Sequence, residues 1–267
     1  MLGNIRPKPD SLRGRVAVTL LAMLPLLAAP LSSAAAQKLP FSSGEELHFR
    51  MRVGGFGTIG TGKMTVSGPE RVRGTSVLLL TSEIRGKIAA LGGNSRTQSW
   101  LDASTMSILR FEALERTPLS RRDESFDIYP AERRWVSDSG NAGRTLTNSP
   151  LDELSFVYFL RTLPLLPGDA YQFDRHFQQG RNPVTVRVLG RQAITVGAGT
   201  FDAVLVEMRV RDPERYRGEG FIRIYFTDDG CRLPLRIESN VPGIGGTVLT
   251  LESHTHPAQH FTRRGAE

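Results

Sequence analysis

Residues 149–163 form the one segment of this chain whose sequence marks a helix at both ends. Ser149 is a residue type that caps helix N-termini, Pro150 is tolerated in the first helical turn, and Pro164 ends a helix. Apolar residues between them recur at helical spacing and predict a helix over about 150–163 with a broad apolar stripe. Such a stripe has to be covered, and the flanking sequence supplies only strands to cover it.

Strand patterns occupy most of the chain on both sides of this segment. Residues 47–53 alternate strictly between apolar and polar side chains, which is typical of a strand with one dry and one wet face. Further strands are predicted at 63–66, 77–84, 96–101, 107–114, 125–129, 133–137, 170–177, 184–189, 192–196, 201–210, 220–226, 232–239 and 247–252. About a dozen strands with one central helix predict an all-β, antiparallel protein, whose curved sheet closes toward a barrel or packs as a sandwich to bury its edges.

The turn after the first strand is rich in glycine. Gly55, Gly57 and Gly60 match the spacing G-x-G-x-x-G of dinucleotide-binding loops. In those loops the N-terminus of a following helix holds the pyrophosphate, whereas here an alternating strand follows. We therefore interpret residues 54–62 as a hairpin and expect no nucleotide site there.

Residues 1–36 have the three regions of a secretory signal peptide: a basic start, an apolar run over 16–31 and small residues that end at Ala36. The run is short for a membrane span and contains two prolines, and no later run is long enough to span a bilayer. The sequence thus predicts export by a cleavable signal peptide to the periplasm or the extracellular space. We expect one β-rich domain over 37–255, a flexible C-terminal tail over 256–267, and no integral membrane segment after processing.

Charge and cysteine content further limit the class of protein to which the chain can belong. Residues 1–36 hold four of the 34 basic and one of the 27 acidic residues, which leaves 30 basic against 26 acidic residues in the rest of the chain. The arginines are scattered among acids and form no basic stripe with aromatic residues, which argues against a nucleic-acid partner. Cys231 is the only cysteine, so no disulfide within the chain supports the fold.

Four patches, taken in order, resemble one family. They are Gly44-Glu45-x-Leu47 with the glycine-rich hairpin behind it, Leu151-Asp152-x-Leu154-Ser155 running to Arg161, residues 197–203, and residues 225–229 with Arg232-Leu233-Pro234. Over residues 41–253 the chain is similar to the exported bacterial family called domain of unknown function 3108. The resemblance implies a secreted, mainly antiparallel β-protein with one central helix, and it implies no established activity.

Three histidines near the C-terminus have the spacing of metal ligands. His254, His256 and His260 form the pattern H-x-H-x3-H, and on a strand the first two would share a face suited to zinc or copper. The segment lies beyond the last apolar strand, where chains tend to fray. We expect a polar tail there and keep the three histidines as the one candidate metal site.

The sequence contains no recognisable catalytic constellation. Asp228 and Asp229 precede a glycine, and on a strand they would point to opposite faces, so we interpret them as turn residues and not as an acid–base pair. The nucleophile-elbow and S-x-x-K motifs are absent, and no histidine lies near Cys231 in the sequence. We expect a protein that is not an enzyme and uses no cofactor.

The dry strand face and the apolar helix together indicate a function. Large β-barrels enclose ligand cavities, and about a dozen strands would surround more space than one helix fills. We expect the chain to bind or carry an apolar or amphipathic ligand, such as a lipid or another envelope component, in a cavity covered by the helix. Its predicted contacts are Phe49, Met51, Leu154, Tyr158 and Arg161. The alternative is a structural or interaction module of the cell envelope that docks another protein.

Overall fold

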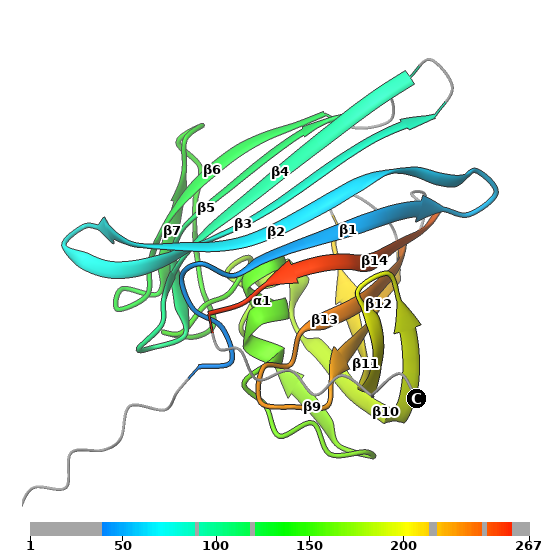
Figure 1. Ribbon diagram of the computed structural model, residues 1–267. Helices are drawn as coiled ribbons and strands as arrows, with labels where there is room; N and C mark the ends of the chain where they lie inside the picture. The colour runs from blue at the N-terminus through cyan, green and yellow to red at the C-terminus, as the bar shows by residue number, and fades with distance from the viewer. Residues whose placement is uncertain (1–38, 89–90, 118–120, 214–217, 242–244, 258–267) are drawn as a thin grey trace, which may run out of the picture. The chain divides into compact units, whose positions relative to one another are not determined.

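A computed structural model of the chain describes residues 39–88, 91–117, 121–213, 218–241 and 245–257 (Figure 1). These residues form one 14-stranded antiparallel sheet in the order β8-β7-β6-β5-β4-β3-β2-β1-β14-β13-β12-β11-β10-β9. The strands are β1 (Glu46–Val53), β2 (Gly57–Val72), β3 (Thr75–Ile88), β4 (Leu91–Asp102), β5 (Ser107–Arg116), β6 (Arg121–Tyr129), β7 (Arg134–Ser137), β8 (Ala142–Arg144), β9 (Ala170–Phe173), β10 (Val184–Val196), β11 (Gly199–Arg211), β12 (Glu219–Thr227), β13 (Pro234–Val241) and β14 (Gly245–Thr255).

Strands that are neighbours in this sheet are also neighbours in the chain, with one exception: β1 pairs with β14 at the middle of the sheet. The sheet is therefore open, with β8 and β9 at its two edges. The predicted all-β, antiparallel class with a helix is confirmed, in the form of a curved open sheet. Two of the predicted strands are one long strand, β10, which a bulge between Val188 and Gly190 interrupts.

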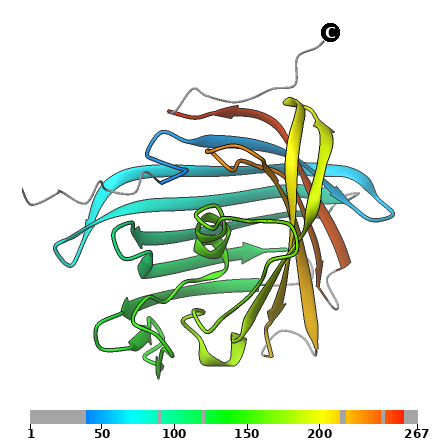
Figure 2. The same cartoon turned by 90° about the horizontal axis from the view of Figure 1, so that it is seen from below.

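The chain between the two edge strands carries α1 (Glu153–Leu160). Figure 2 shows the sheet curling around this helix. The helix contacts β3 and β4, and every residue from Leu154 to Leu160 is buried. A helix that is apolar on all sides is covered on all sides. The sheet thus encloses the helix more completely than a single apolar stripe requires.

The first residue of the helix differs from the prediction. The N-cap is Asp152, whose Oδ1 accepts hydrogen bonds of 2.8 Å from the N–H groups of Leu154 and Ser155. The Ser155 hydroxyl accepts in return from the N–H of Asp152 at 2.8 Å, which completes a capping box. The prediction of Ser149 as the N-cap is therefore wrong, and the helix is shorter than 150–163.

A β-bridge explains why the helix starts late. Leu151 pairs in parallel with His176, and its N–H donates to the carbonyl oxygen of Arg175 at 2.6 Å. This bridge holds residue 151 in an extended conformation. The helix can therefore begin only after it, at the next residue able to cap.

The alternation predicted for the first strand is confirmed. In β1 the side chains of Leu47, Phe49 and Met51 are buried on the inner face, and the polar residues between them are exposed. The inner face of β1 joins a continuous hydrophobic cluster that also contains the helix residues Leu154 and Tyr158. The core therefore lies between the helix and the inner face of the sheet.

The described chain is anchored at its C-terminal end. His256 is buried, and its Nε2 lies 3.2 Å from both the carbonyl oxygen of Pro40 and a carboxylate oxygen of Glu45. The range 256–267, predicted as a flexible tail, thus begins with a residue that is buried and in contact with Pro40 and Glu45. Residues 258–267 lie outside the described residues, as does the predicted signal peptide at 1–36. Among the described residues, no helix has the length and apolar content for a membrane crossing.

Candidate functional site

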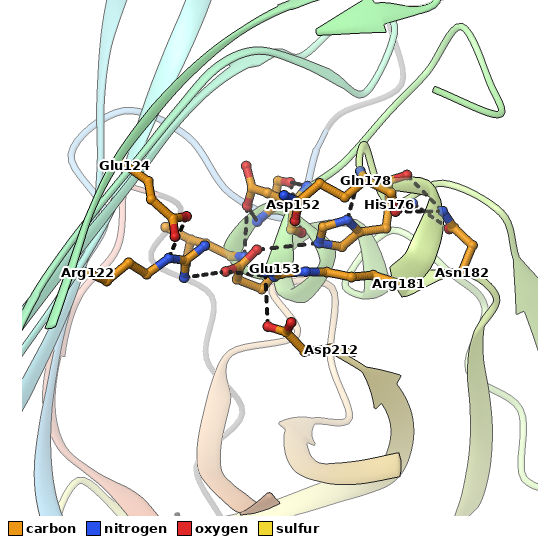
Figure 3. Close-up of polar contacts among 11 residues, drawn as sticks. Arg122, Glu124, Asp152, Glu153, His176, Gln178, Arg181, Asn182 and Asp212 are labelled. Atoms are coloured by element: carbon orange, nitrogen blue, oxygen red, sulfur yellow. Dashed lines mark hydrogen bonds and ion pairs between the residues drawn. The ribbon is translucent and has the colours of Figure 1, made fainter. Parts of the chain in front are cut away.

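Charged side chains gather at the N-terminal end of α1, inside the curve of the sheet (Figure 3). Glu153 pairs with Arg122 of β6 at 2.9 Å and with Arg181 at 3.5 Å. Its other carboxylate oxygen lies 3.4 Å from Nε2 of His176. Arg181, which belongs to the short 3-10 helix η1 (Gln179–Arg181), pairs in turn with Asp212 at 2.9 Å. This helix-start cluster ties α1 to chain segments from both halves of the sheet.

Four side chains of the helix-start cluster are nearly buried, whereas the side chain of Glu153 is 34% exposed. The side chains of Arg122, His176, Arg181 and Asp212 are each at most 10% exposed. Burial alone would raise the pKa of Glu153, but the contact with His176 and the charges of both arginines hold that pKa well below its ordinary value. Burial also lowers the pKa of His176, against the opposing effect of Glu153. The cluster therefore contains an ionised carboxylate between two arginines.

Asp152, next to this cluster, has the opposite tendency. Burial, and then the negative charge of Glu153, raise the pKa of Asp152 to about 7. Hydrogen bonds from the N–H groups of Ser155 and Leu154 offset this only in part. Two adjacent acids at the helix start thus have pKa values moved apart by their surroundings.

The Asp152→Asn substitution tests the raised pKa. Asn caps helices about as well as Asp, so the variant keeps the cap and removes the titration. The folded pKa of Asp152 lies above its ordinary value of 3.8, so proton binding favours the folded state, and this stabilisation is lost as the pH rises through about 7. We expect the free energy of unfolding of the variant, relative to that of the wild type, to increase between about pH 5 and about pH 8. Urea denaturation of both proteins over this range measures the difference. A difference that stays constant with pH would contradict the assignment.

A second buried cluster lies at the other end of α1. Arg161 donates two hydrogen bonds of 2.7 Å to Glu45 and further bonds to the carbonyl oxygens of Pro40 and Cys231 at 2.8 and 2.9 Å. His256 contacts the same carboxylate. Burial would raise the pKa of Glu45, but Arg161 and His256 together lower it. This helix-end cluster connects the chain before β1, the end of the helix and the chain after β14.

The predicted ligand contacts all lie in the interior. Phe49, Met51, Leu154 and Tyr158 share one hydrophobic cluster, and Arg161 lies at its border in the helix-end cluster. The sequence predicts that the guanidinium of Arg161 contacts a ligand. Instead it bonds a carboxylate and two carbonyls from other segments. The structure thus places four of the five residues in one extended hydrophobic core and the fifth at its border, and contact of any of them with a ligand stays a prediction.

The structure describes two of the three candidate metal ligands. His254 is half-buried in β14, His256 is bonded in the helix-end cluster, and His260 lies outside the described residues. Within the part of the chain that the structure describes, no three His, Cys, Asp or Glu side chains are grouped to hold a metal ion. The two histidines that can be placed therefore have other surroundings than a metal site provides.

The two adjacent acids at residues 228 and 229 stabilise a turn. Asp229 accepts hydrogen bonds from the N–H groups of Cys231 and Arg232 at 2.9 and 3.1 Å. Asp228 pairs with the side chain of Arg232 at 2.8 Å. These contacts agree with their interpretation as turn residues between β12 and β13.

Sequence reasoning misses both charged clusters, although the strand patterns contain a signal for each. Alternate residues of a strand face the core. Counting back by two from Leu47 of β1 gives Glu45, and counting back by two from Phe126 of β6 gives Glu124 and then Arg122. A charge at a dry position is costly unless a partner is buried with it. The pattern therefore indicates that partners exist, but not which residues supply them.

Part of the inner face is only half-covered. On one side, Val210, Ile222 and Ile237 of β11, β12 and β13 are half-buried against the hydrophobic core. On the other side, β3, β4 and β6 present the half-buried polar side chains of Ser82, Thr97 and Glu124, of which Ser82 and Thr97 are paired across strands. We call these six residues the open inner face. It has an apolar side and a polar side.

One of three solved structures that match the chain at low sequence identity shares its fold. A β-barrel-like protein of the domain of unknown function DUF1849 from Brucella abortus aligns over 81% of this chain and 98% of its own, with a TM-score of 0.55 and 9% identity. A protein from Parabacteroides distasonis provisionally described as a lipoprotein, and one from Bacteroides fragilis provisionally described as exported with a YmcC-like fold, cover the same shares at 11% identity with TM-scores of 0.32 and 0.33. The first of these likenesses shows a shared class of antiparallel β-fold.

The sequence gives the family within that class. Residues 48–252 match the family described as protein of unknown function DUF3108, and the chain belongs to this family. The predicted resemblance is thereby confirmed. No curated protein matches the chain.

Proposed function

We propose that this protein is a non-enzymatic binding protein of the cell envelope, which holds an apolar or amphipathic ligand such as a lipid against its open inner face. The observation that carries the proposal is the pairing of an apolar side, with Ile222 and Ile237, and a polar side, with Ser82 and Thr97, on one concave surface. Apolar side chains left half-buried gain free energy when a ligand chain covers them. A ligand with both an apolar chain and a polar end fits such a surface.

Arg122 supplies a place for the polar end. Its side chain is 9% exposed, and its Nη2 has no hydrogen-bond partner in the described part of the chain. A buried donor without a partner costs about 1–3 kcal/mol. Arg122 lies on the same strand and face as Glu124 of the open inner face, and Nη2 is itself covered, so a side chain that covers it would have to move for a head-group oxygen to accept from it and remove that cost.

This site differs from the cavity expected beneath the helix. Leu154 and Tyr158 pack in the core, so the helix itself occupies the space that the sequence analysis assigned to a ligand. The open inner face remains the concave surface with incompletely covered apolar side chains. The proposed location in the cell envelope is based on the signal-peptide pattern of residues 1–36. The lack of a catalytic constellation in the sequence supports a binding role.

Native mass spectrometry of the protein, purified from its host without detergent, tests the proposal. We expect an adduct with the mass of an acyl-chain compound, and its removal should lower the melting temperature by ligand linkage. The stripped protein should bind a fluorescent long-chain fatty acid. Bare protein that neither carries an adduct nor binds the probe would overturn the proposal and leave the interaction module as the better function.

A pair of matched variants locates the site. Ile237→Asn places an amide on the open inner face and should weaken probe binding by about tenfold, since the covered side chain contributes about 1.5 kcal/mol or more. Leu189→Asn makes the same change at a leucine of β10 that is 48% exposed, and it should leave binding unchanged. Equal binding by both variants, with both folded by circular dichroism, would place the ligand elsewhere.

A further inference from the structure

The outer face of the sheet is hollowed where β13, β14, β1, β2, β3, β4 and β5 lie side by side, next to the turn between β10 and β11. Three hollows of about 590, 680 and 620 Å³ occur there. The first and second share Arg50 and Glu252 in their linings, and the second and third share Gly60 and Arg85. They therefore adjoin one another, and together they form what we call the outer band.

Basic residues dominate the outer band. Its charged lining residues are Arg50, Arg52, Lys63, Arg85, Lys87, Arg116 and Arg236, against Glu83 and Glu252. Most of these cations have an acidic neighbour: the ion pairs are Arg50–Glu252, Lys63–Glu46, Arg85–Glu83, Arg116–Asp123 and Arg236–Glu238. The band still has a net positive charge, because two of its cations are left over.

These two cations are Arg52 and Lys87. Both side chains are exposed, and neither has an ion pair or a hydrogen bond with any described residue. Surface cations of this kind cost the fold nothing when they bind an external anion, since no internal contact has to break. The outer band therefore has charge available for a partner.

An exposed aromatic side chain lies beside the first hollow. Phe56 is 62% exposed at the tip of the β1–β2 hairpin, and its neighbours Gly55 and Gly57 line the hollow. The two glycines have φ angles of +80° and +72°, so the turn depends on them and presents Phe56 outward. Among the large apolar side chains that the structure describes as exposed, this one is the most exposed. A single exposed apolar residue is ordinary on a protein surface. Phe56 is of interest because it borders the basic outer band.

We propose that the outer band and Phe56 dock this protein on an anionic lipid surface. Cations near such a surface are attracted to it within about a Debye length, and an aromatic ring enters the level of the head groups. The band crosses seven neighbouring strands from β13 to β5, which at about 4.8 Å between strands is a width of roughly 29 Å. That width spans several lipid head groups, whereas a single small anion would need one compact pocket.

A lipid surface fits this face better than an acidic peptide does. An extended peptide commonly binds by adding a strand to a sheet edge. The outer band lies across β1 and its neighbours, whose backbones are paired on both sides, while the edges are β8 and β9. A peptide there would lack backbone partners, and it would leave Phe56 without a role. The docking face is also the opposite face of the sheet from the open inner face, so the two proposals stand independently.

Sedimentation with vesicles tests the proposal. The purified protein should sediment with vesicles of phosphatidylcholine containing phosphatidylglycerol, should not sediment with phosphatidylcholine alone, and should be released when the salt rises from about 0.1 M to about 1 M. Phe56→Ser should lower the partition coefficient about tenfold. The double variant Arg52→Gln with Lys87→Gln should lower it to a similar extent, and should remove part of the salt dependence.

Matched controls use residues away from the band. Leu166→Ser changes a leucine that is 54% exposed, and Arg187→Gln changes an exposed arginine of β10. Both should bind vesicles like the wild type. A Phe56→Trp variant adds fluorescence that brominated phosphatidylglycerol should quench beyond the wild-type level. Equal binding to both kinds of vesicle, control variants as weak as the band variants, or fluorescence of the Phe56→Trp variant that the brominated lipid quenches no more than that of the wild type would each overturn the proposal.

Discussion

Arg161→Met should lower the free energy of unfolding by about 3–5 kcal/mol, the range found when one partner of a buried ion pair is removed. The side chain of Glu45 is fully buried. In the variant its carboxylate charge would stay buried with only His256 as an ion-pair partner. The carbonyl oxygens of Pro40 and Cys231 lose their donor as well. Urea denaturation monitored by circular dichroism measures the change.

A double-mutant cycle separates the ion pair from the other contacts. Glu45→Leu alone should also destabilise strongly, because it leaves the guanidinium of Arg161 without its carboxylate. The variant with both changes should be more stable than the sum of the two losses predicts, since neither charge is then buried alone. Strict additivity would mean that the 2.7 Å contacts between the two side chains carry no coupling energy.

Leu154→Ala should lower the free energy of unfolding by about 2–5 kcal/mol as a large-to-small change in a packed core. Leu154 lies in the first turn of α1, is 6% exposed and belongs to the main hydrophobic cluster. The size of the loss measures how firmly the helix is held inside the sheet, because a site that collapses around the smaller side chain loses less.

Leu166→Ala is the matched control for this variant. It is the same chemical change at a leucine that is 54% exposed, in the turn before β9. Its effect should stay within about 0.5 kcal/mol, as is usual for surface positions. Comparable small losses in both variants would show that the helix is not docked on the sheet.

The class of fold could be predicted because it depends on local patterns. Burial of alternate side chains marks β1 from residues 47–53 alone, and the combination of many such strands with one apolar helix restricts the architecture to a sheet folded around that helix. Closure of the sheet could not be predicted. Closure depends on whether β8 pairs with β9. The residue pattern of a single strand does not indicate which other strand it will pair with.

The start of the helix and the charged clusters depend on contacts between distant segments. Ser149 is a good cap by its residue type, but the bridge between Leu151 and His176 removes it from the helix. Arg161 and Glu45 are 116 positions apart in the chain, so no spacing rule connects them. Glu45 and Arg122 stand at buried positions of the strand pattern, and the fold decides which side chains each of them contacts.

The pairing of β1 with β14 has a consequence for how the chain folds. Every other strand pair joins consecutive segments, so this contact alone requires the two ends of the described chain to find each other. The ends also meet beyond the strands, where Pro40 and His256 lie in hydrogen-bonding contact. A circular permutant that joins these ends with a short linker and opens the chain at the exposed Leu146 would have its strands in the order in which they pair. Its contact order would be lower, because the pairing of β1 with β14 would become a local hairpin, and we expect it to fold faster.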